Sequence, residues 1–172
     1  MLYKLNNEKG FTLVESLAAV LALTLLAAIL AVCLSAATQV FKKSVFVSES
    51  EILAASLNTE FSNILRYSKG SIDDNSAVRF TNASYMAEDA YFVVDDYVYL
   101  HEDAIEGTQD ATSVNLVNRG AYTSLVIKDF YLEYNTTTHI FTGNYTIQMK
   151  DDPSLSKDVI FSFKSLVFEP SP

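Results

Sequence analysis

The stretch KGFTLVE at residues 9–15 stands directly before 26 residues without a formal charge, from Ser16 to Phe41. Leu, Ala, Val and Ile make up most of this run. A transmembrane helix needs about 20 predominantly apolar residues, so the run is long enough to span a bilayer. No Pro or Gly occurs between Phe11 and Tyr67, and nothing local interrupts a helix there. We therefore expect one helix over about residues 11–67.

One carboxylate, that of Glu15, stands at the N-terminal rim of the apolar run. A charged side chain at the bilayer centre costs roughly 2.5–3.5 kcal/mol on insertion scales, and less near the interface. Such a group needs a partner. If the chain were cut between Gly10 and Phe11, the new α-amine would lie four residues before Glu15. In a neighbouring copy displaced by about one helical turn, that amine would meet the carboxylate and neutralise it.

The segment K-G-F-T-L-V-E-S-L ahead of an apolar helix resembles the class III signal peptide and N-terminal methylation motif of type IV prepilins and pseudopilins. The resemblance implies that a prepilin peptidase cuts after Gly10 and methylates Phe11, and that Glu15 guides assembly into a filament. It also implies three parts: a leader peptide at residues 1–10, a transmembrane and filament-core helix at 11–41, and an exported globular domain at 42–172.

Three other interpretations explain the N-terminus less well. A conventional secretory signal has an apolar core of about 7–15 residues, which is shorter than this run, and would not carry Glu15 at its start. A lipoprotein signal would use Cys33, but Val32 stands before it, where a small residue is expected. A plain single-pass anchor leaves the spacing of Gly10, Phe11 and Glu15 to chance.

Charge alone does not orient the span, because Lys4 and Lys9 precede it and Lys42 and Lys43 follow it. The resemblance implies that the N-terminus lies in the cytoplasm and the domain outside. Overall the chain carries a formal charge of −9, which argues against nucleic-acid binding by the domain because phosphate contacts need basic patches. Cys33 is the only cysteine, so the domain forms no internal disulfide.

Beyond the apolar run, the sequence predicts an α+β domain. Apolar side chains recur at spacings of three, four or seven, which predicts an amphipathic continuation of the helix; they are Phe46, Leu53, Leu57, Phe61 and Ile64. A turn at Lys69-Gly70-Ser71, with Gly70 as the C-cap, is expected to end the helix. The helix should pack on an antiparallel sheet of about four strands.

Alternating apolar residues predict where the strands lie in the sequence. Residues 90–101 are expected to form two short strands or one strand bent at Asp95-Asp96, and a polar loop should follow over 102–113. A hairpin joins two longer strands across residues 135–139. The expected strands are Ala77–Thr81, Ala90–His101, Ser124–Tyr134, Ile140–Lys150 and Lys157–Phe168.

The sequence contains no convergent set of groups typical of an enzyme, a cofactor site or a zinc site. His101 and His139, the only histidines, fall at a strand end and in a hairpin loop, where we expect hydrogen-bonded or solvated side chains. Acidic pairs at turns offer oxygen atoms that calcium prefers, but none follows an ordered calcium loop, and solvated turns are expected. These pairs are Asp73-Asp74, Asp95-Asp96, Glu102-Asp103 and Asp151-Asp152.

The resemblance implies a structural subunit of a type IV pilus, a type II secretion pseudopilus or a competence filament. Glu15-Ser16-Leu17, and the lack of a proline at Val32, favour a minor subunit. Its implied partners are a prepilin peptidase and methyltransferase, other pilin subunits, an assembly ATPase with its membrane platform, and membrane lipid before assembly. The alternative is a bitopic anchor that displays a binding or adhesion domain and never polymerises.

Overall fold

The computed structural model describes residues 12–72, 78–82, 90–102 and 112–167. The chain divides into two compact units, residues 1–44 and 45–172, and each is described by itself. The helix α1 (Leu13–Leu65) contributes to both units.

In the first unit, α1 is apolar on all sides. Every large apolar side chain from Leu13 to Phe41 is at least 54% exposed. The helix is long and apolar enough to span a membrane. A helix that is hydrophobic all round needs an apolar environment, either in a core or in a bilayer. The sequence and this exposure together indicate a single-pass membrane anchor.

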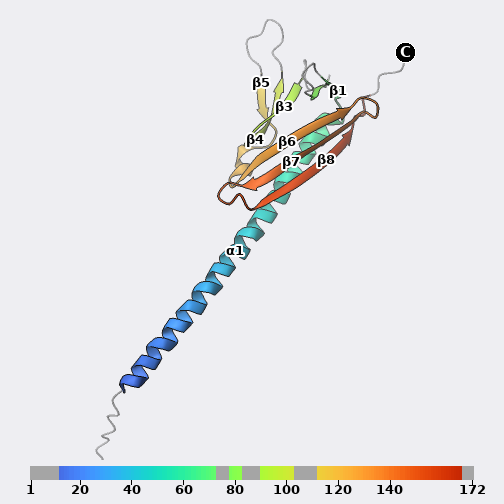
Figure 1. Cartoon of the computed structure of the whole chain (residues 1–172). Coiled ribbons are helices and arrows are strands. Elements are labelled where there is room, and N and C mark those ends of the chain that lie inside the picture. Colours follow the sequence, from blue (N-terminus) through green and yellow to red (C-terminus); the bar gives the residue numbers. More distant parts are fainter. Residues whose placement is uncertain (1–11, 73–77, 83–89, 103–111, 168–172) are drawn as a thin grey trace, which may run out of the picture. The chain divides into compact units, whose positions relative to one another are not determined.

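In the second unit, the remaining part of α1 buries one face, as its apolar spacing predicts. The side chains on that face are Phe46, Ser50, Leu53, Ala54, Leu57, Phe61 and Leu65. Figure 1 shows this part of the helix running alongside the strands β6, β7 and β8. One long helix followed by antiparallel sheets is a pilin-like α+β arrangement, so the predicted fold class is confirmed.

The strands form two antiparallel sheets. The first has five strands in chain order: β1 (Lys69–Ile72), β2 (Val78–Thr81), β3 (Ala90–Asp95), β4 (Tyr97–Glu102) and β5 (Thr112–Asn115). The second is a meander of β6 (Leu125–Asn135), β7 (Ile140–Met149) and β8 (Ser156–Lys164). A short 3₁₀ helix, η1 (Arg119–Tyr122), lies between the two sheets in the sequence.

Two aspartates with positive φ lie where the sheets meet. Asp96 (φ 59°) separates β3 from β4, and Asp129 (φ 51°) lies in a β-bulge of β6 between Lys128 and Tyr131. An isolated β-bridge joins Asp96 to Ile127 of β6. Asp tolerates the left-handed conformation better than most residues, which suits it to both positions. The predicted interruption at Asp95-Asp96 is therefore confirmed.

Aromatic rings join the helix to both sheets, and Phe61 of α1 is their common neighbour. Its ring centroid lies 5.0 Å from that of Phe92 in the first sheet and 4.8 Å from that of Phe161 in the second. The Tyr145 hydroxyl is 3.2 Å from Asn58 Oδ1 on the helix, to which it donates a hydrogen bond. Burial raises the pKa of Tyr145 and raises the pKa of Tyr122 to about 12.

Two local predictions were wrong, and a third differs only at its edges. Lys69-Gly70-Ser71 is not a turn but part of β1, and Gly70 is no C-cap: it is buried where a Cβ would come within 2.7 Å of the Tyr134 and Phe141 rings. The expected loop over 102–113 contains the start of β5 and the end of β4, while 103–111 lie outside the described residues. The last strand was expected to reach Phe168 but ends at Lys164. Beyond it, the Leu166 amide donates a hydrogen bond to Arg66 O, at the end of the helix, and not to a neighbouring strand.

The number of strands also differs, since the described residues form eight strands in two sheets instead of one sheet of about four. The helix begins at Leu13 and ends at Leu65, and the predicted hairpin across 135–139 is confirmed. In that hairpin Asn135 Oδ1 accepts hydrogen bonds from the Thr137 and Thr138 amides.

Gly143→Ala is expected to destabilise the second unit by about 1–3 kcal/mol, because overpacking forces neighbours to move. An added Cβ would lie 2.5 Å from both the Phe161 ring and the backbone oxygen of Tyr131. Urea unfolding of the detergent-solubilised chain, followed by tyrosine circular dichroism, measures the loss. Gly120→Ala is the control, because its Cβ meets only Asn118 Oδ1 at 3.3 Å. Equal stability of the two variants would contradict this packing.

Candidate functional site

The first turn of α1 holds Glu15 in a reciprocal cap with Thr12. The Thr12 amide and hydroxyl donate hydrogen bonds to Glu15 Oε2 over 3.0 and 2.9 Å. In return, the Glu15 amide donates to Thr12 Oγ1 over 3.3 Å. Helix N-termini leave backbone N–H groups without intrahelical partners, and this arrangement is a capping box. These hydrogen bonds therefore hold the carboxylate against the first turn of the helix.

The capping box was missed in the sequence, although its signal is present. Thr12-Leu13-Val14-Glu15 follows the pattern Ser or Thr, two residues, then Glu or Gln, which marks a helix N-terminus. It also supplies a purely local reason for Glu15 at this position. An acidic group in the first turn is favoured by the helix dipole as well.

Three further hydroxyl groups of the apolar segment donate hydrogen bonds to backbone oxygens of the same helix. Ser16 Oγ donates to Leu13 O over 2.9 Å, and Thr24 Oγ1 donates to Leu21 O over 2.8 Å. Thr38 Oγ1 donates to Leu34 O over 2.7 Å. Because each unsatisfied polar group is costly in hydrocarbon, these internal bonds make the segment compatible with lipid or with a packed bundle of helices.

The other predicted site residues are placed only in part. Gly10 and Phe11 lie outside the described residues. Cys33 is exposed on the apolar helix. Glu15 is exposed at the start of that helix, in position to meet another molecule.

Neither histidine belongs to a convergent group. His101 Nδ1 lies 2.7 Å from Ser113 Oγ, and His139 Nδ1 lies 2.9 Å from the Tyr134 hydroxyl. Both are hydrogen-bonded residues at strand ends or turns, as expected.

The acidic pairs are likewise dispersed. Asp96 pairs with Lys128, and Asp152 Oδ1 accepts hydrogen bonds from Ser154 in a turn. The hydrogen bond to Asp96 raises the pKa of Lys128. Asp73, Asp74 and Asp103 lie outside the described residues. Within the described ranges, no three His, Cys, Asp or Glu side chains come together as metal ligands.

Thr12→Val is expected to loosen the first turn of α1 by about 1 kcal/mol, the usual cost of losing a cap side chain. The substitution removes the hydroxyl and keeps the shape of the side chain. Hydrogen exchange of the first-turn amides in micelles should therefore quicken about fivefold. Thr12→Ser retains the hydroxyl and should exchange like the unmodified chain. Unchanged exchange in Thr12→Val would show that the cap contributes nothing.

Comparison with known proteins matches only the N-terminal part of the chain. Residues 5–37 match the family described as the prokaryotic N-terminal methylation motif. No curated protein and no solved structure gives a significant match. The matched range includes Gly10, Phe11, the Thr12 and Glu15 cap, and most of the exposed apolar helix. Residues 5–37 thus carry the class III signal of a type IV pilin-like or pseudopilin-like precursor.

Proposed function

We propose that the chain is a structural subunit of a type IV filament, cut after Gly10, methylated on Phe11 and assembled through α1. The observation that carries the proposal is the match of residues 5–37 to the methylation motif, together with the exposure of every large apolar side chain of α1 from Leu13 to Phe41. As a precursor, the helix lies in the cytoplasmic membrane with its N-terminus inside. In the filament, the helices of neighbouring copies bury the same surface against each other.

The charge of Glu15 would set the register of this packing. A carboxylate moved into an apolar bundle without a partner is expensive, whereas a paired one is tolerated. Cleavage creates the α-amine of Phe11, the opposite charge, at the same end of every copy. The cap with Thr12 supports this role, because it holds the carboxylate at the start of the helix.

A minor role in a pilus, a type II secretion pseudopilus or a competence filament is the finer form of the proposal. Few copies per filament, near its tip or at its initiation, are then expected. The partners would be a prepilin peptidase and methyltransferase, other pilin subunits, and an assembly ATPase with its membrane platform. The domain would lie outside the cytoplasmic membrane before assembly and on the filament afterwards.

Replacement of Gly10 tests the proposed processing. In cells with an active prepilin peptidase, Gly10→Val is expected to retain all 172 residues, because the bulkier side chain blocks the cut. Asn7→Ala is the control in the leader and should lose residues 1–10. Intact mass measurement of the membrane fraction distinguishes the two products. Shortening of Gly10→Val at the same bond would contradict the assignment of the cleavage site.

The rival interpretation is a membrane-anchored binding domain that does not polymerise. It predicts that membrane protein accumulates to the same level whether or not the peptidase is present, and that sheared filaments never contain the chain. Recovery of the chain in sheared filaments, dependent on the peptidase, would exclude this rival.

A further inference from the structure

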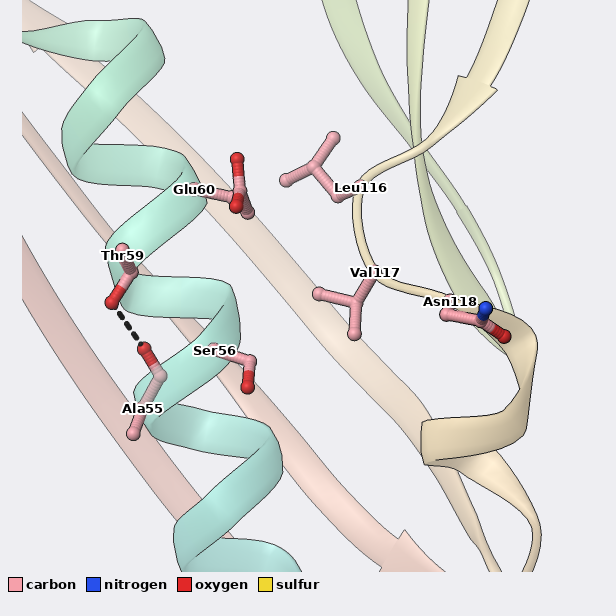
Figure 2. A pocket seen from close by; sticks show the side chains of 7 residues that line it. All are labelled: Ala55, Ser56, Thr59, Glu60, Leu116, Val117 and Asn118. Atoms are coloured by element: carbon pink, nitrogen blue, oxygen red, sulfur yellow. Dashed lines mark hydrogen bonds between the residues drawn. The ribbon is translucent and has the colours of Figure 1, made fainter.

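A groove runs between α1 and the segment that follows β5. Its volume is about 480 Å³. Figure 2 shows the helix side chains along one wall and Leu116, Val117 and Asn118 along the other. The helix contributes Ala55, Ser56, Thr59 and Glu60. All of these residues lie in the second unit, so the groove is a feature of the globular part of the chain.

The helix wall of the groove presents hydrogen-bond acceptors. Thr59 Oγ1 donates its proton to Ala55 O over 2.8 Å, the contact drawn in Figure 2. Ser56 Oγ likewise donates to Ile52 O over 2.9 Å. Each hydroxyl proton is thus used within the helix, and the oxygen lone pairs remain available. On the other wall, Leu116 and Val117 present apolar side chains, beside Asn118, whose Oδ1 accepts a hydrogen bond from the Gly120 amide.

Glu60 adds a formal charge to the acceptor wall. It is partly exposed, and it forms no ion pair with any residue that the structure describes. A carboxylate opposite two aliphatic side chains is complementary to a group that has an apolar stem and a cationic head. Lysine and arginine side chains have this composition, and they cover apolar surface while the charge stays in a polar environment.

Three lysines of the globular unit already have partners, while Lys164 is exposed and forms no ion pair with any described residue. Lys128 pairs with Asp96, Lys157 pairs with Glu51, and Lys150 donates to Tyr122 O. By contrast, Lys42 and Lys43 are exposed and form no ion pair within the described part of the chain. They directly follow the apolar run that the proposed function packs between copies.

We propose that the groove beside Glu60 binds Lys42 or Lys43 of a second copy of this chain in the filament. This is a different copy from the one whose Phe11 meets Glu15, because Glu60 lies 17 residues after Lys43 on α1, about 26 Å along the helix. The inference rests on the proposed function, and it names a second contact in addition to the pairing of Glu15. The stem of the lysine would lie against Leu116 and Val117, and its ammonium group would meet the Glu60 carboxylate. Complementary charge across an interface chiefly sets register and partner choice.

Charge reversal and exchange test this contact. Glu60→Lys alone, and Lys42→Glu with Lys43→Glu, are each expected to lower incorporation into sheared filaments roughly threefold or more, because like charges then face each other. Combining Glu60→Lys with the two lysine reversals should restore incorporation. Lys164→Glu is the matched control, since it changes the same charge at an exposed lysine outside the groove. Membrane levels of each variant show whether it folds and accumulates.

A cysteine pair gives a direct measure of proximity. In a Cys33→Ala background, Thr59→Cys with Lys43→Cys should form disulfide-linked dimers in filaments on mild oxidation, and neither single cysteine should do so. If the combined charge variant does not regain incorporation, or if the cysteine pair forms no dimer in filaments, the contact proposed here is wrong. The proposed function is not affected by either result. A defect in Glu60→Lys without one in the lysine variants also overturns the contact, because the occupant is then not a second copy. Absence of unmodified filaments overturns the proposed function, and this contact with it.

Discussion

Glu15→Val is expected to insert in the membrane normally but to be at least about tenfold less abundant in filaments, since breaking a buried charge pair costs about 3–5 kcal/mol. In the filament that we propose, the substitution would leave the Phe11 α-amine of a neighbouring copy without its counter-charge in an apolar bundle. Valine also suits the apolar run that follows, so insertion itself should not suffer. Filament shearing followed by quantitative mass spectrometry, compared with the membrane fraction, measures the ratio.

Glu15→Gln separates the charge from the cap. Glutamine also completes a capping box, so it keeps the hydrogen bonds to Thr12 while removing the charge. If charge pairing governs assembly, the glutamine variant should be as defective as the valine variant. Incorporation of Glu15→Gln at the level of the unmodified chain would mean that Glu15 serves only the helix end.

Phe61→Ala is expected to destabilise the globular unit by about 3–5 kcal/mol, the usual cost of deleting a buried aromatic ring. The ring is fully buried and lies within 6 Å, between centroids, of rings from both sheets. Its removal therefore leaves a cavity where the helix meets Phe92 and Phe161. Since this is a large part of the stability of a typical domain, the chain should also accumulate poorly in cells.

Ile52→Ala is the matched control for Phe61→Ala, because Ile52 lies on the same helix and is 65% exposed. Its loss should stay within about 0.5 kcal/mol, as for most surface substitutions. Urea unfolding of the solubilised chains compares the two. A similar loss in both variants would contradict the placement of Phe61 at the junction of the helix and the two sheets.

The long helix and its two kinds of surface could be predicted from the sequence. An uninterrupted apolar run followed by apolar residues at helical spacing identifies both parts of α1 without knowledge of any contact. The hairpin across 135–139 was also predictable, because alternating apolar residues flank a polar turn. These features depend on local periodicity, which a single sequence records directly.

The division into two sheets could not be predicted in this way. The division falls between β5 and β6, and the pairing of each strand depends on contacts with residues distant in the sequence rather than on a local pattern. Gly70 was misinterpreted for a related reason. A glycine after a helix usually caps it, but here the missing side chain makes room for Tyr134 and Phe141, which are distant in the sequence.

The candidate site likewise has a part that the sequence predicts and a part that it does not. The methylation motif, and with it the role that we propose for Glu15, could be predicted from the spacing of Gly10, Phe11 and Glu15. The capping box of Thr12 and Glu15 also follows a recognisable sequence pattern. The groove beside Glu60 could not be predicted, because its second wall comes from residues 116–118, more than fifty positions later.

The N-terminal residue of the chain recovered from filaments tests the central claim most directly. The claim is that processing creates an amine that pairs with Glu15 of a neighbouring copy. Peptide mass spectrometry of sheared filaments should find a chain that begins at Phe11 and carries a methyl group on that residue. Recovery of a chain that still begins at Met1, from cells in which the peptidase is active on another prepilin, would contradict the account.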